Sequence, residues 1–196
     1  MRLLFLFMMV TLDGDFEGQN HDLSWHVVDQ EFNRFAVEQL KQIGTLLFGR
    51  ITYQLFEEYW PKAGRDPATS KENLEIARMI NYVEKIVFSR TLANVKEADD
   101  WKNVRLIREA QREEITRLKQ LSGKDIAIFG SNDLATYFLR MGLIDELRIM
   151  VNPVVIGNGN PLFRGMTHHV KLKLLRTKTF RSGNVLHYYQ PEITRK

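Results

Sequence analysis

The sequence predicts an α/β fold of three layers, in which helices cover both faces of a mostly parallel central sheet. Apolar, β-prone runs at 45–48 and 125–129 each end in small residues and lead directly into a helical pattern. The opening run 3–10 shows no alternation of apolar and polar residues, as is typical of a strand buried on both faces. Strands that alternate with helices favour parallel pairing, so we expect these runs to share one sheet.

The segment after the first strand is expected to begin with a loop and to continue as a helix. Loop 11–18 is rich in glycine and acidic residues and is long enough to form a mobile flap. Ser24 is the expected N-cap of the helix that follows, which carries an apolar stripe over 32–43.

Three further helices are predicted. The first begins after the strand at 45–48 and ends at Pro61. The second lies near 72–80, directly after Ser70. The third, over 109–121, connects two strands, and its inward side is expected to carry Ile115, Leu118 and Leu121.

The remaining segments complete the sheet. A polar stretch over 93–105 is predicted to loop across the surface, with Trp101 covering core. Another strand covers 144–151. Two runs, 170–180 and 185–190, are separated by a glycine-containing turn and predict an antiparallel hairpin at the C-terminal end of the sheet.

The turn at Gly49 and Arg50 is the first candidate binding site. A strand that turns sharply into a helix directs the unpaired N–H groups of the helix at its first turn, which favours an anion. A guanidinium offers a fork of donors matched to phosphate oxygens, and glycine allows close approach. The alternative is an ordinary turn with a solvent-facing arginine, and these residues alone do not decide between the two.

Two further strand exits carry polar residues. One is the run Ser89-Arg90-Thr91, whose hydroxyls next to a guanidinium suit a phosphate monoester such as the 2′-phosphate of NADP. The other is Gly130-Ser131-Asn132-Asp133, followed directly by Leu134 and a helix. Such exits meet at the carboxyl edge of a parallel sheet, where open α/β sheets bind nucleotides. The sequence contains neither of the standard glycine-rich phosphate-loop motifs.

Composition indicates one soluble domain over 1–196. The chain is 44% hydrophobic and 27% charged, which is typical of a globular protein with a sizeable core and not of a membrane protein. It has no cysteine, which excludes disulfides and thiolate metal sites and favours the cytoplasm. The apolar run 3–10 is shorter than the about 20 residues that span a bilayer.

Basic residues are concentrated toward the C-terminus. Eight of the 28 Lys and Arg residues follow Phe163, against a single acid, Glu192. A continuous basic footprint would suggest a nucleic-acid partner. However, Lys171 and Lys173 alternate with leucines, as on the solvent face of a strand whose other face is core, so no nucleic-acid partner is expected.

In these runs and in their order, the sequence resembles the dihydrofolate reductase fold. It is most similar to stand-alone proteins that resemble the reductase domain of the bacterial riboflavin-biosynthesis deaminase–reductase. The runs that carry the resemblance are 11–14, 47–53, 59–61, 87–92, 128–131, 142–147, 152–159 and 161–163.

The resemblance implies that NADPH binds across the edge of the sheet, because no side chain can supply a hydride by itself. By the family pattern, Gly49, Arg50 and Thr52 lie near the pyrophosphate, together with 130–134. Ser89, Arg90 and Thr91 lie at the 2′-phosphate. The expected contacts to the nicotinamide ring are Leu12, Asp13 and Gly14.

The resemblance also places a carboxylate at the substrate, near the start of the first helix. Asp29 and Glu31 are the candidates for pairing with ring N–H groups and assisting proton delivery, and Trp25 and Asp29 are the expected substrate contacts. The alternative is that an acid at a helix start only interacts favourably with the helix dipole.

We therefore expect an NADPH-dependent reductase that transfers hydride to a small heterocyclic substrate of riboflavin or pterin type. The alternatives are a reductase of another small carbonyl compound and a nucleotide-binding protein without turnover. No metal is expected, since His168 and His169 are adjacent and lack a third ligand at helical spacing. The apolar C-terminal hairpin makes a homodimer an open expectation.

Overall fold

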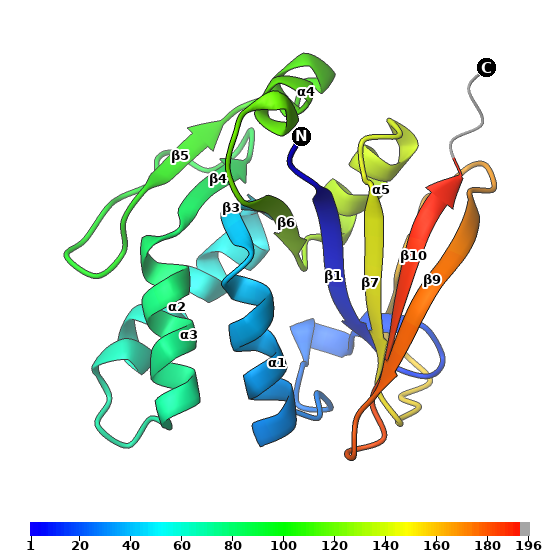
Figure 1. Cartoon of the computed structure of the whole chain (residues 1–196), viewed down its shortest axis with the longest axis horizontal. Coiled ribbons are helices and arrows are strands. Elements are labelled where there is room, and N and C mark those ends of the chain that lie inside the picture. Colours follow the sequence, from blue (N-terminus) through cyan, green and yellow to red (C-terminus); the bar gives the residue numbers. More distant parts are fainter. Residues whose placement is uncertain (193–196) are drawn as a thin grey trace.

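The computed structural model describes residues 1–192, in which an eight-stranded sheet forms the middle layer (Figure 1). The strands lie in the order β5-β4-β3-β6-β1-β7-β10-β9. Their bounds are β1 Leu4–Val10, β3 Ile43–Gly49, β4 Glu84–Phe88, β5 Val104–Ile107, β6 Asp125–Phe129, β7 Glu146–Val151, β9 Lys171–Thr179 and β10 Val185–Glu192. The helices are α1 Gln30–Leu40, α2 Arg50–Arg65, α3 Lys71–Tyr82, α4 Arg112–Gln120 and α5 Asn132–Arg140.

The six strands from β5 to β7 pair in parallel, and β10 and β9 add to the β7 edge as an antiparallel hairpin. The expected fold class is therefore confirmed. β1 lies near the centre, with β6 on one side and β7 on the other. All three elements come from distant parts of the sequence, so the centre of the sheet consists of non-local pairings.

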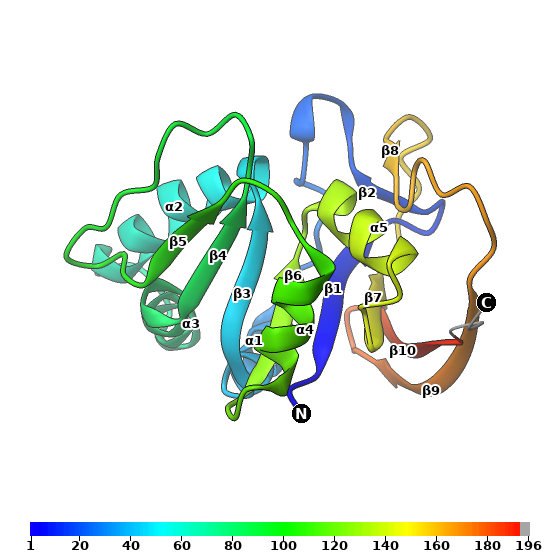
Figure 2. The same ribbon diagram turned by 90° about the horizontal axis from the view of Figure 1, so that it is seen from above.

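Alternate residues of β1 point to the two faces of the sheet, and helices cover both (Figure 2). Leu4 and Leu6 pack into a core with α4 and α5, where Phe138 is fully buried. Phe5 lies in a second core with α1, α2 and α3, which also contains Trp101. A strand without a polar face is thus explained by burial on both sides.

The first helix begins later than predicted. α1 starts at Gln30, and its N-cap is Asp29, whose carboxylate accepts a hydrogen bond of 2.8 Å from the backbone N–H of Phe32. The prediction of Ser24 as the cap was wrong. Its backbone N–H instead donates to the Asp22 carboxylate over 2.9 Å, in a local turn within an irregular segment.

Three other details of the helices and loops differ from the sequence analysis. α2 continues through Pro61 to Arg65, and Ala63 in its last turn is buried. Leu121 is 51% exposed since α4 ends before it, whereas Ile115 and Leu118 are buried as predicted. Part of the predicted loop 93–105 belongs to β5, a short edge strand of four residues.

Loop 11–18 is paired and hydrogen-bonded along much of its length, and its mobility as a flap stays a prediction. Residues Asp15–Glu17 form strand β2, which pairs with β8, Asn160–Pro161. The Asp13 carboxylate accepts a 2.8 Å hydrogen bond from the N–H of Gly157, and the backbone N–H of Leu12 donates to Val154 O over 2.8 Å. The acidic residues of this loop therefore bind the backbone of the segment after β7.

The edge strand β9 is exposed on both faces, which corrects the expectation that its leucines face the core. Leu172, Leu174 and Leu175 are 40%, 51% and 45% exposed, respectively. The strand lies at the end of the sheet, beyond the helices that cover the centre (Figure 2). Within residues 1–192, no helix has the length and apolar character needed to cross a membrane.

Replacing Gly159 with alanine is expected to lower the free energy of unfolding by about 1–3 kcal/mol. A Cβ at this position would lie 2.6 Å from the carbonyl oxygen of Glu17 and 2.8 Å from Asp15 Cβ, so β2 and β8 would have to separate. Urea denaturation measures the effect. Asn158→Ala, at the exposed neighbouring position, is the control, and equal midpoints for the two variants would contradict the prediction.

Candidate functional site

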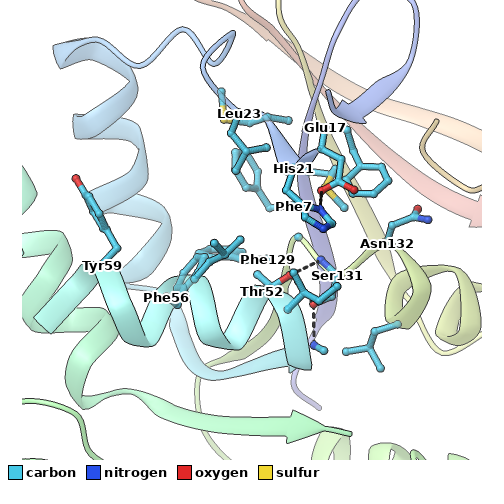
Figure 3. A pocket seen from close by; sticks show the side chains of 18 of the residues that line it. Phe7, Glu17, His21, Leu23, Thr52, Phe56, Tyr59, Phe129, Ser131 and Asn132 are labelled. Carbon is cyan, nitrogen blue, oxygen red and sulfur yellow. Dashed lines mark hydrogen bonds and ion pairs between the residues drawn. The ribbon is translucent and has the colours of Figure 1, made fainter. Parts of the chain in front are cut away.

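Three neighbouring strand exits surround one cavity of about 1270 Å³ (Figure 3). β4, β3 and β6 are adjacent and parallel, so their carboxyl ends lie at the same edge of the sheet. Ser89, Gly49 and Gly130 stand at these three ends, and all of them line the cavity. The strand exits selected from the sequence are therefore brought together by the sheet order.

The exits of β3 and β6 are joined by side-chain hydrogen bonds (Figure 3). Ser131 Oγ accepts from the N–H of Gly49 over 2.7 Å and donates to Thr52 Oγ1 over 3.0 Å, and the N–H of Ser131 also donates to Thr52 Oγ1 over 3.0 Å. Both glycines allow this close packing. A Cβ at Gly130 would lie 3.1 Å from Thr52, and a Cβ at Gly49 would lie 3.2 Å from Ser131 Oγ.

These hydrogen bonds among Gly49, Thr52 and Ser131 place the N-termini of α2 and α5 side by side at the cavity. The N-cap of α2 is Gly49, which has no side chain to cap the helix. The N-cap of α5 is Ser131, whose side chain makes no capping hydrogen bond to that helix. The first N–H groups of the two helices thus remain available at the positive ends of two helix dipoles. Such a pair of termini favours a ligand with several phosphate oxygens.

Arginines add positive charge to the same part of the cavity. Arg50 and Arg90 are exposed and line it, as does Arg108. Arg108 also holds the exit of β4, since its guanidinium donates to Ser89 O over 3.3 Å and to Ala93 O over 2.9 Å. The run after β4 is therefore fixed by a cation that itself faces the cavity.

The wall on the side of α1 and α2 is built from aromatic and aliphatic side chains (Figure 3). Its aromatic members are Phe7, Phe32, Phe35, Phe56, Tyr59, Trp60 and Phe129. Several are in mutual contact, with ring centroids 5.7 Å apart for Phe7 and Phe129 and 6.0 Å apart for Phe7 and Phe35. These contacts give the wall a fixed shape suited to a flat, apolar ligand.

Glu17 and His21 form a hydrogen-bonded pair at the cavity (Figure 3). The Glu17 carboxylate lies 2.8 Å from His21 Nδ1 and accepts a 2.8 Å hydrogen bond from Asn160 Nδ2. Its side chain is 14% exposed. Asn20 and His21 both have positive φ, 55° and 61°, so the backbone that presents the imidazole is held in a strained conformation.

His26 also lines the cavity, and its ring is held neutral. Burial lowers the pKa of His26 to about 4, although Asp22 nearby favours the charged form. The ring packs edge-on against Trp25, with centroids 4.4 Å apart. Among the residues described by the structure, Nε2 of His26 is buried without a hydrogen-bond partner.

Most of the predicted cofactor residues lie at the cavity. Those that line it are Gly49, Arg50, Thr52, Ser89, Arg90, Gly130, Ser131, Asn132, Asp133 and Leu134. Those outside the lining are Leu12, Asp13, Gly14 and Thr91. The predicted substrate and catalytic residues Trp25, Asp29 and Glu31 also lie outside it. Leu12 and Asp13 are exposed, and Thr91 lies in the turn fixed by Ser89 Oγ.

The two candidate catalytic carboxylates are engaged away from the cavity. Asp29 caps α1, and Glu31 accepts a 3.0 Å hydrogen bond from the backbone N–H of Arg181 in the β9–β10 turn. Their role in catalysis stays a prediction. The carboxylate that lines the α1 side of the cavity is Glu17, which the sequence analysis did not select because nothing distinguishes it from the other acids of loop 11–18.

The sequence analysis also did not identify the aromatic wall or Arg108 as parts of the site. The periodic spacing of Phe32 and Phe35 predicts an inward face but does not distinguish core from a cavity wall. Arg108 stands alone in a polar stretch without a motif. Over the described range 1–192, the chain has no cluster of three His, Cys, Asp or Glu side chains that could hold a metal ion.

Comparison with known proteins agrees with this architecture. A family model described as the RibD C-terminal domain matches residues 2–186. The protein YyaP of Bacillus subtilis (strain 168) is 37% identical over 184 residues, which cover 94% of this chain and 92% of YyaP. The resemblance stated from the sequence is thereby confirmed.

Solved structures share the fold at low identity. One is a diaminohydroxyphosphoribosylaminopyrimidine deaminase/5-amino-6-(5-phosphoribosylamino)uracil reductase from Thermotoga maritima, with a TM-score of 0.68 and 16% identity. The match covers 97% of this chain and 57% of that one. Another is dihydrofolate reductase from Enterococcus faecalis complexed with NADP(H), with a TM-score of 0.59, 15% identity and 97% coverage of both chains.

Replacing His26 with phenylalanine is expected to reduce the loss of stability in acid. Below about pH 6.5 the unfolded chain binds a proton at His26, whereas the folded protein binds it only near pH 4, so the free energy of unfolding falls as pH falls through this window. The contribution is on the order of 2 kcal/mol between about pH 7 and about pH 4.5. Urea denaturation at both pH values measures it. His169→Phe, at an exposed position, is the control, and an unchanged pH dependence in His26→Phe would contradict the prediction.

Proposed function

The chain belongs to the family of the RibD C-terminal domain, and from this premise we propose that it is an NADPH-dependent reductase of a small heterocyclic or carbonyl compound. The observation that carries the proposal is the arrangement of three strand exits and two uncapped helix N-termini around one cavity with arginines at its rim. In this family of folds, one solved relative carries reductase in its name and another is complexed with NADP(H).

The residues at the strand exits fit a dinucleotide. The N–H groups at the starts of α2 and α5 are proposed to bind the pyrophosphate, and the packing of Gly49 against Ser131 and of Gly130 against Thr52 keeps the two helix starts together. Arg50 adds a guanidinium at the same end. When bound, NADPH supplies the hydride, and the protein supplies orientation.

Arg90 is proposed to recognise the 2′-phosphate that distinguishes NADPH from NADH. It follows Ser89 at the end of β4, two strands from β6, and its exposed side chain lines the cavity. Ser89 Oγ accepts from the N–H groups of Thr91 and Leu92 over 3.2 and 2.9 Å, which fixes the turn that carries Arg90. A guanidinium on a fixed turn matches a phosphate monoester.

Glu17 and His21 are proposed to deliver the proton that accompanies hydride transfer. Because Nδ1 of His21 faces the Glu17 carboxylate, Nε2 is the ring nitrogen left for a ligand. The carboxylate orients the imidazole, and Asn160 fixes the carboxylate. His21 is half-exposed, so solvent can return the proton after each turnover. Asp29 and Glu31 are the alternative proton donors.

Arg50→Ala is expected to weaken NADPH and NADH binding alike, by roughly 10- to 100-fold, the equivalent of a lost charge-assisted hydrogen bond. Arg90→Ala is expected to weaken NADPH by a similar factor and leave NADH unchanged. Titration followed by nicotinamide fluorescence measures both. Arg78→Ala, an exposed arginine on α3 outside the cavity, is the control. Absence of binding of either cofactor to the wild-type protein would reject the proposed function.

Glu17→Gln and His21→Gln are each expected to lower kcat by roughly 10²-fold or more with NADPH binding unchanged. NADPH oxidation, with a substrate found by screening heterocyclic and carbonyl compounds, measures the effect. Asp29→Asn is the comparison, because asparagine caps a helix as well as aspartate does, so its fold is retained. A loss of turnover in Asp29→Asn but not in Glu17→Gln would reject the pair and support Asp29.

A further inference from the structure

The cavity has two parts with different chemistry. Among residues 1–192, the arginines that line it are Arg50, Arg90, Arg108 and Arg164. The first three stand after β3, β4 and β5, on the side where the cofactor phosphates are proposed to bind. Arg164 follows Phe163, whose N–H donates to Asn132 at the start of α5. The positive charge is therefore gathered around the strand exits.

The other part is lined by α1, α3, β1 and the segment 16–28. Among the described residues, these elements contribute aromatic, aliphatic and amide side chains, the histidines 21 and 26, and one carboxylate, that of Glu17. Phe32 and Phe35 of α1 face Phe7 of β1 at ring-centroid distances of 6.5 and 6.0 Å. Phe56 and Tyr59 extend this surface along α2 (Figure 3).

The aromatic surface favours a flat ring for two reasons. Burial of apolar area against fixed side chains is favourable in proportion to the area, and offset or edge-on contacts between rings add to it. The wall is also preorganised, because Phe7, Phe35 and Phe129 already support one another. A ligand ring can therefore enter without reordering several side chains.

This part of the cavity offers an anion no net positive charge. Glu17 is held by His21 and Asn160, so its carboxylate stays at the cavity, and Glu17 and His21 together carry no net positive charge. His26 is kept neutral by burial and gives no compensating positive charge near neutral pH. A phosphate placed here would lose water and meet a like charge.

We propose that the substrate of this reductase is a flat, unphosphorylated ring compound that lies against the aromatic wall beside Glu17. The proposal rests on the proposed function and narrows its substrate class. It distinguishes this chain from relatives whose printed name contains a phosphoribosyl substrate. The ring stacks on the wall, and its polar edge faces Glu17 and His21.

Riboflavin and flavin mononucleotide test the proposal, because they share one ring and one side chain and differ only in a phosphate. Both are titrated into protein saturated with NADP⁺, so that the arginines at the strand exits are occupied, and flavin fluorescence reports binding. Riboflavin is expected to bind roughly 10-fold more tightly than flavin mononucleotide. Glu17→Gln is expected to narrow this ratio by roughly 3-fold or more, since it removes the repelling charge.

A pair of tyrosine variants tests the wall itself. Tyr59 and Tyr82 are 56% and 54% exposed, and only Tyr59 lines the cavity. Tyr59→Ala is expected to weaken riboflavin binding by roughly 3- to 10-fold, and Tyr82→Ala to leave it unchanged. Equal or tighter binding of flavin mononucleotide, or no riboflavin binding up to its solubility limit, would overturn the inference. Failure of NADP⁺ to bind in a preceding calorimetric titration would instead reject the proposed function.

Discussion

The hydrogen bonds among Gly49, Thr52 and Ser131 are the constraint on which the site depends. They tie the start of α2 to the start of α5, and each helix follows a strand of the parallel sheet. Ser131 adopts a left-handed conformation, φ 57°, to reach both partners. The position of two helix dipoles, and hence of the charged half of the cavity, follows from this one contact. The aromatic half depends on it in part, because α2 and β6 contribute Phe56 and Phe129, and in part on the packing of α1 against β1.

Much of the fold could be predicted because buried strands and helices have characteristic patterns of apolar residues in the sequence. The unbroken apolar runs of β1 and β6 and the helical periodicity after Gly49 and Gly130 have only a few structural solutions. Boundaries were harder to predict. Asp29 displaced Ser24 as the cap of α1, since both residue types cap helices and the tertiary structure decides which one is used. The edge strand β5 has only four residues, too few for a clear pattern, and β9 is exposed on both faces although its sequence resembles a half-buried strand.

The site was predictable where it lies on strand exits and unpredictable where it lies on a cavity wall. Arg50, Arg90 and Ser131 each follow a buried strand of the parallel sheet, and the carboxyl ends of such strands meet at one edge, so their proximity could be inferred from their order. In contrast, Glu17 reaches the cavity only because β2 pairs with β8, a contact between segments about 140 residues apart. No local pattern records such a pairing. The same holds for the aromatic wall, whose residues look like core until the opposite side is known.

The central place of β1 has a consequence for biosynthesis. The ribosome completes this apolar strand first, but its two neighbours, β6 and β7, end only at Phe129 and Val151. Until those residues emerge, both edges of β1 lack their native partners and expose hydrogen-bonding groups that can join other chains. Most of the polypeptide must therefore be synthesised before its first strand is protected, and we expect nascent chains of this protein to depend on chaperones that cover extended apolar segments.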